Sequence, residues 1–94
     1  MTITVGLIVN YTLSEHNAEL INKRRQDTEA WLHGNTAHHG EVYPMLIVRV
    51  WNQDPGTVNG QVFLDGNDSL WVTSVARAET AANDGCRWSW PERV

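Results

Sequence analysis

The sequence predicts a small, strand-rich α+β domain, in which one N-terminal helix is inserted after a first strand and before an antiparallel SH3-like meander or barrel. Three observations indicate this fold class. The hydrophobic residues follow a helical period early in the chain and a period of two from residue 42 onward. A loop rich in glycine and small polar residues, 33–40, separates the two patterns. The length of 94 residues suits one hydrophobic core, so we expect a single domain over 1–94.

Residues 1–13 predict an N-terminal strand or arm. The run 3–9 is apolar and β-branched, as in a buried strand, but periodicity alone does not separate a strand from an arm here. Ser14 has the side chain of a helix N-cap, and Glu15 places negative charge in the first turn, where the helix dipole favours it. We therefore expect a helix over 14–33.

Residues 42–94 predict the antiparallel meander. The residues between its strands are turn-formers: Asp-Pro-Gly at 54–56 and the tight-hairpin signal Asp-Gly-Asn-Asp at 65–68. A short last strand is expected at Arg87–Trp90, before Pro91. The three main strands are expected near 45–52, 58–64 and 69–75.

Composition excludes several classes of partner. The chain has 7 basic and 11 acidic residues, a net charge of -4, and nucleic-acid binding depends on a positive surface. We therefore expect no nucleic-acid partner and interpret the basic run 23–25 as a solvated helix face. No run approaches the roughly 20 apolar residues of a membrane span, and residues 3–9 do not predict an export signal. The single cysteine, Cys86, excludes an internal disulfide and fits a reducing cytoplasm.

No catalytic motif is visible, so we expect that the protein is not an enzyme. The sequence lacks a nucleophile elbow, a glycine-rich phosphate loop and a His-Glu-x-x-His pair. His33, His38 and His39 form the only histidine cluster, but a spacing across two glycines fixes no ligand geometry. We therefore expect no metal and no cofactor.

The five tryptophans and one arginine are the most unusual features of the predicted strands. Trp88 and Trp90 fall on one side of a strand, where they either pack in the core or form an aromatic wall. Trp71 falls opposite to its two apolar neighbours. The alternation puts Arg49 on the face of Met45, where a guanidinium needs a carboxylate, a phosphate or an aromatic ring. Arg49 thus either forms an internal ion pair with the 65–68 turn or binds an anionic ligand.

These residues predict a non-catalytic ligand groove. A hairpin brings the end of one strand beside the start of the next, so polar groups of the turn and an aromatic ring should converge. Surplus tryptophan and an apolar N-terminal strand also predict self-association, most simply as a two-fold dimer. The candidate ligand-binding residues are Arg49, Asp65, Asn67, Asp68, Trp71, Trp88, Trp90 and Arg93.

Several segments carry a resemblance to a known family: 11–19, 21–25, 33–35, 42–44, 48–50, 59–74 and 88–93. Together they resemble a family of small uncharacterised proteins encoded by phages of actinobacteria. The resemblance brings no assigned activity. It implies a phage accessory protein, made in the host cytoplasm, that works by stoichiometric binding.

Two binding functions are compatible with this context. In the first, a homo-oligomer acts as a sponge that sequesters a small nucleotide-like molecule, such as a nucleotide-derived host immune signal. In the second, the protein is an adaptor or inhibitor that covers a host protein with an SH3-like sheet face or an exposed edge. A minor virion-structural barrel is a third alternative.

Overall fold

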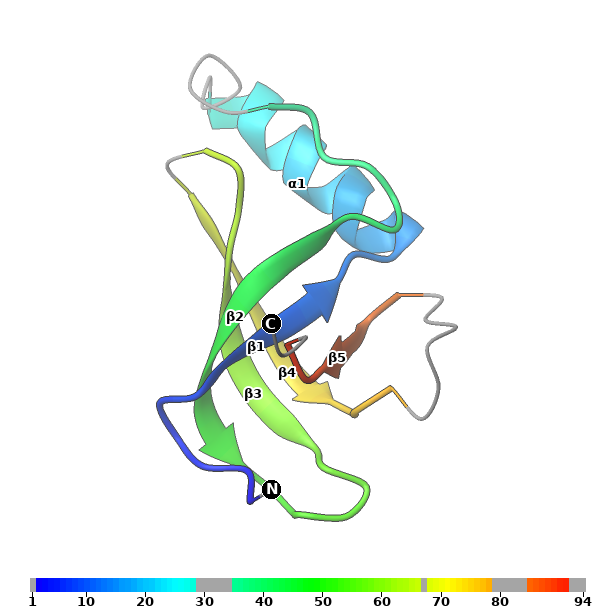
Figure 1. The fold of residues 1–94 in the computed structure, drawn as a ribbon. Helices are drawn as coiled ribbons and strands as arrows, with labels where there is room; N and C mark the ends of the chain where they lie inside the picture. Colours follow the sequence, from blue (N-terminus) through cyan, green and yellow to red (C-terminus); the bar gives the residue numbers. More distant parts are fainter. Residues whose placement is uncertain (1, 29–34, 67, 79–84, 92–94) are drawn as a thin grey trace.

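The computed structural model describes residues 2–28, 35–66, 68–78 and 85–91 and contains one helix and a curled antiparallel sheet (Figure 1). The sheet has five strands in the order β4-β3-β2-β1-β5. The elements are β1 (Ile8–Thr12), α1 (Glu15–Thr28), β2 (Val42–Val50), β3 (Val58–Phe63), β4 (Ser69–Val75) and β5 (Arg87–Ser89). The prediction of a strand-rich α+β fold, with one helix and an antiparallel meander of three main strands, is therefore confirmed.

The sheet curls into a half-barrel because the chain beyond β4 returns to β5. The Ala78 N–H donates to the Trp88 carbonyl at 2.8 Å, and the Trp88 N–H donates to the Ala76 carbonyl at 3.2 Å. Arg77 and Trp88 form a parallel bridge. β5 thus pairs with β1 on one side and with residues 76–78 on the other.

The inner side of the half-barrel holds the hydrophobic core. Trp88 is its largest fully buried side chain, and the indole N–H of Trp88 donates to the Gly56 carbonyl at 2.8 Å. α1 lies at one end of the half-barrel and adds Ala18 and Ile21 to this core (Figure 1). The sheet contributes alternate residues of its strands: Val9, Tyr11, Met45, Ile47, Val58, Val62, Val72, Val75 and Trp88.

The start of α1 is capped as the sequence predicts. The Ser14 Oγ accepts the Asn17 N–H at 3.0 Å, and the Asn17 Oδ1 accepts the Ser14 N–H at 2.9 Å. This reciprocal pair satisfies two backbone donors at the helix start. The same Asn17 oxygen accepts the buried Tyr11 hydroxyl at 2.9 Å, which fixes the helix start to β1. The predicted extension of the helix over 29–33 lies outside the described residues.

The N-terminal segment, predicted to be a strand or an arm, contains both: β1 covers Ile8–Thr12, and residues 3–7 form an arm that meets β2. The Gly6 N–H donates to the Ile47 carbonyl at 2.8 Å, and the Ile47 N–H donates to the Leu7 carbonyl at 2.9 Å. Gly6 has a φ of 96°, a conformation that glycine adopts without strain. β2 also starts and ends earlier than the predicted 45–52, because its N-terminal half pairs with β1.

Two irregularities beside β3 overturn the predicted orientation of Arg49. The β2–β3 register shifts between Ile47 and Arg49, and the β3–β4 register shifts between Val58 and Gly60. Such a bulge reverses the alternation of side chains beyond it. Arg49 is therefore exposed, although the alternation from the fully buried Met45 predicts that it faces the core.

Asn59 lies between the two bulges and holds both together. Its Oδ1 accepts the backbone N–H of Ser74 at 2.8 Å and the indole N–H of Trp51 at 2.9 Å. Ser74 has a φ of 53°, which takes its N–H out of the regular ladder. The buried carboxamide of Asn59 thus replaces the ladder contact that the bulge removes.

We predict that Gly60→Ala destabilises the fold by about 1–3 kcal/mol through overpacking. A Cβ on Gly60 would stand 2.6 Å from the Met45 Cγ and 2.9 Å from the Leu46 carbonyl oxygen. Urea denaturation of the variant measures the loss. Gln61→Ala is the matched control, because Gln61 alternates away from the core, and it should stay within about 0.5 kcal/mol of the wild type. Equal stability of Gly60→Ala and the wild type would contradict this packing.

Candidate functional site

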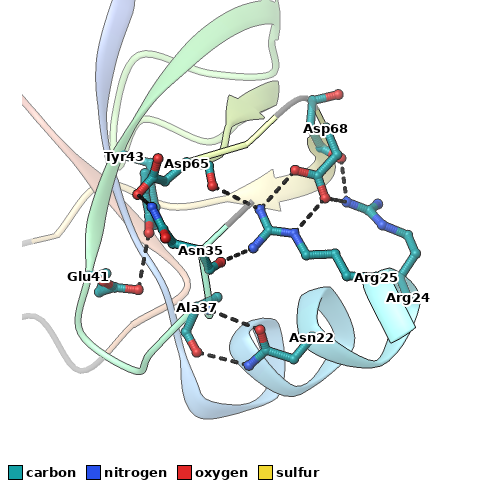
Figure 2. A network of polar contacts seen from close by, with 10 residues as sticks. Asn22, Arg24, Arg25, Asn35, Ala37, Glu41, Tyr43, Asp65 and Asp68 are labelled. Atoms are coloured by element: carbon teal, nitrogen blue, oxygen red, sulfur yellow. Dashed lines mark hydrogen bonds and ion pairs between the residues drawn. The ribbon is translucent and has the colours of Figure 1, made fainter. Parts of the chain in front are cut away.

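The turn between β3 and β4 is bound to α1 by a buried arginine (Figure 2). The side chain of Arg25 is 3% exposed, and its Nε and Nη2 donate to the two carboxylate oxygens of Asp68 at 2.9 and 2.8 Å. Its Nη1 donates to the Asn35 carbonyl. A buried guanidinium is tolerated when a carboxylate pairs with it in this two-point geometry.

Arg24 reinforces the same contact from the exposed side. Its Nη2 donates to the Ser69 carbonyl at 2.8 Å and lies 3.4 Å from the Asp68 Oδ2. We name Arg24, Arg25 and Asp68 the arginine clasp. The Asn35 amide donates to the Asp65 carboxylate at 2.7 Å, so both ends of the turn are held.

The clasp corrects two predictions. The basic run 23–25 is not simply a solvated helix face, because Arg25 is buried. The internal partner of the turn is Arg25, whereas one of the two interpretations of Arg49 was an ion pair with Asp65 or Asp68 of this turn. The sequence alone does not show whether Arg24 or Arg25 contacts Asp68, which lies more than forty residues further along the chain.

The electrostatics of the clasp follow from these contacts. The hydrogen bonds from Arg25 hold the pKa of the Asp68 carboxyl below its ordinary value, although burial acts in the opposite direction. The same bonds raise the pKa of Arg25. Nearby, burial and a hydrogen bond to Glu41 raise the pKa of Tyr43. Arg25 and Asp68 are thus engaged with each other, and the neutral Tyr43 with Glu41.

The other predicted site residues do not gather around the turn. Trp88 is a core residue, and Trp90 packs edge-on against it at a centroid distance of 5.0 Å. Arg49 pairs with Asn59 near the start of β3, whereas the 65–68 turn follows the end of β3. Asn67 and Arg93 lie outside the described residues.

Arg49 belongs instead to an exposed aromatic pair that sequence reasoning missed. Its guanidinium lies 4.0 Å from the ring centroid of Trp51, which is half exposed. Trp51 is held by Asn59 through its indole N–H. The apolar alternation around Trp51 suggested a continuing strand and gave no sign of the bulge that brings the two side chains together.

The exposed large side chains of the sheet share its outer face, the side away from the core. Ile8 pairs with Leu46, Leu46 with Gln61, and Gln61 with Trp71, so these four residues form one row across β1, β2, β3 and β4. Ile8 is 57% exposed and Trp71 is 49% exposed. We define the outer face by this row together with its neighbours Val42, Pro44, Val48, Arg49, Trp51, Asn59, Phe63 and Ser69.

Charge is almost absent from the outer face. Over Ile8–Thr12, Val42–Val50, Val58–Phe63 and Ser69–Val75, Arg49 is the single charged residue, although 19% of the chain is charged. Antiparallel sheets with one solvated face normally carry polar residues there. The outer face is therefore built like a surface that another molecule covers.

No family model, no curated protein and no solved structure matches the chain. Among the described residues, no group of three or more His, Cys, Asp or Glu side chains is placed to hold a metal ion. Within the same residues, no helix has the length and apolar character to cross a membrane.

We predict that Arg25→Met lowers the free energy of unfolding by about 3–5 kcal/mol, because it leaves the carboxylate of Asp68 without its buried partner. Arg24→Met is the matched control on the adjacent residue. Arg24 is 43% exposed, so its loss should cost less than about 1 kcal/mol. Chemical denaturation of both variants measures the difference. Equal losses would show that the clasp does not depend on Arg25.

We predict a specific loss of stability in acid from Asp68. Its folded pKa lies below its ordinary value of 3.8, so the folded state holds a proton on this group less readily than the unfolded chain. The stabilisation is complete above the ordinary value and is lost as the pH falls through the folded pKa. Urea midpoints of the wild type and Asp68→Asn, measured between about pH 2 and pH 6, should converge at the acid end. A constant difference between the two would contradict the prediction.

Proposed function

We propose that the protein is a non-catalytic binding protein that covers a host protein with the outer face of its sheet. In this proposal it is an accessory protein of an actinobacterial phage, acts in the host cytoplasm, and uses an SH3-like half-barrel as a scaffold. The observation that carries the proposal is the row from Ile8 to Trp71, apolar apart from Gln61 and without a charge.

The residue types of the outer face favour a protein partner. Protein interfaces exclude charged residues from their centre and are enriched in tryptophan, phenylalanine and arginine. The outer face carries Trp51, Trp71 and Phe63, each about half exposed, and its one charge is Arg49. Stacking on Trp51 orients the guanidinium of Arg49, which lies 4.0 Å from the ring centroid.

The outer face is also rigid enough to bind without a large loss of entropy. All of its residues except Trp51 lie on paired strands, and the Asn59 carboxamide fixes the position of the Trp51 indole, which follows the end of β2. A surface that is already ordered loses less conformational freedom on association. This supports stoichiometric binding by a preformed surface.

The sponge is the weaker proposal because its predicted pocket residues are engaged elsewhere. Asp68 is paired with Arg24 and Arg25, the Trp88 indole donates to Gly56, and Arg49 lies near the opposite end of β3 from the turn. Calorimetry against a panel of nucleotides, together with native mass spectrometry, tests the sponge directly. A retained nucleotide would favour it over the adaptor. Recovery of the protein from purified virions would favour the structural alternative.

We predict that Ile8→Glu reduces capture of the host partner at least about tenfold, because a carboxylate would be buried in an apolar contact. The tagged chain is used to capture protein from an actinobacterial lysate, and the stoichiometry of the recovered complex is measured by calorimetry. Leu20→Glu is the matched control, since Leu20 is an exposed leucine on α1 and not on the sheet. Equal capture by wild type and Ile8→Glu, or equal loss in both variants, would contradict the proposal.

A further inference from the structure

β4 forms an edge of the sheet and has the composition of a strand that pairs with another chain. It is the first strand in the order β4-β3-β2-β1-β5, so within the described residues it has one strand neighbour. Its sequence, SLWVTSV, contains no charge and no proline. Edge strands that avoid association usually carry a lysine, a proline or an inward-pointing charge. The first four residues of β4 carry none of these. The Arg24 guanidinium of α1 covers the Ser69 carbonyl, and the bulge lies at Thr73 and Ser74, so the regular edge is centred on Trp71.

The register identifies the backbone groups that face away from β3. The Leu64 N–H donates to the Asp68 carbonyl, so hydrogen-bonded and non-hydrogen-bonded pairs alternate from that point along the ladder. Leu70 and Val72 then bond to β3, whereas Ser69 and Trp71 direct their N–H and C=O groups outward. The contact between Arg24 and the Ser69 carbonyl agrees with this assignment.

We propose that two copies of the chain pair antiparallel through β4, about a two-fold axis that passes between their Trp71 residues. Each Trp71 N–H then donates to the Trp71 carbonyl of the other copy, and the two sheets join into one. In this pairing each side chain of β4 lies opposite a side chain of β4 in the other copy. Because β4 is uncharged, no like charges meet across the axis.

A second copy is the expected partner of this edge, because pairing of the two β4 strands leaves the described sheet no open edge for a third copy. The opposite end of the sheet, β5, is already paired with residues 76–78. The bulge at Thr73 and Ser74 limits the regular part of the edge to a short segment. Among its described residues each chain thus offers one short edge, and a two-fold contact uses both copies of it, which gives a dimer and no fibre.

The dimer would leave the outer face available. Trp71 lies at the edge of that face, so the rows of the two copies meet at the axis and form one longer row. This inference goes beyond the proposed function and does not depend on it, because edge pairing uses backbone groups of β4 and binding of a host protein uses side chains of the outer face.

Sedimentation of the purified full chain tests the dimer. The wild type should sediment at twice its mass of 10.6 kDa at tens of micromolar. Trp71→Lys and Trp71→Glu should each be monomeric, because two like charges would meet at the axis, with the dissociation constant raised at least tenfold. An equimolar mixture of the two variants should restore a dimer, because the charges are then opposite. Restoration also shows that both variants fold.

Further variants separate this contact from others. Trp71→Pro removes an N–H that faces away from β3 and should give a folded monomer, whereas the neutral Trp71→Thr should remain dimeric. Gln61→Lys is the matched control on the neighbouring strand, and Ile8→Glu tests the outer face; both should remain dimers. A monomeric wild type, a dimeric Trp71→Lys, or a dimer that Ile8→Glu alone dissociates would overturn the proposal. The last result would place the contact on the outer face.

Discussion

The structure depends on the ion pair between Arg25 and Asp68, because it joins three segments that share no strand ladder. Arg25 comes from α1, Asp68 from the turn before β4, and the Asn35 carbonyl from the segment after the helix. A guanidinium removed from water is stable only when its donors are satisfied, so these segments can pack only in the arrangement that supplies those acceptors. The hydrophobic core stabilises the half-barrel. The Tyr11–Asn17 hydrogen bond holds the start of the helix on it, and the ion pair holds the last turn of the helix against the turn before β4.

Much of the fold was predictable because it follows from local chemistry. The Ser14 cap, the three main strands and the 65–68 turn depend on residues that are close in the sequence. The bulges beside Asn59 were not predictable from the sequence. An inserted residue leaves no mark in an alternating pattern when apolar residues continue on both sides of it. The error for Arg49 followed directly, because one bulge moves a side chain to the other face of the sheet.

In the candidate site, too, some features follow from the local sequence and others depend on contacts between distant residues. The surplus of tryptophan singled out the indoles, but periodicity left open whether Trp88 is a core or a pocket residue and did not predict that Trp51 and Trp71 are both exposed. The deciding contacts are long-range: Trp88 with Gly56, and Trp51 with Asn59 across a bulge. The sequence does show that four strands carry a single charged residue, Arg49. This becomes informative once the register shows that the outer face is otherwise uncharged.

The position of β5 has a consequence for the order in which this chain acquires its structure. β1 lies between β2 and β5, and the largest fully buried side chain, Trp88, belongs to the last of the described strands. During synthesis from β1 toward β5, the helix and the meander therefore emerge before the residue that fills the centre of the core. Contacts between such distant segments slow folding, since a long loop must close before they form. A nascent chain without residues 87–89 would keep one edge of β1 open and its core unfilled.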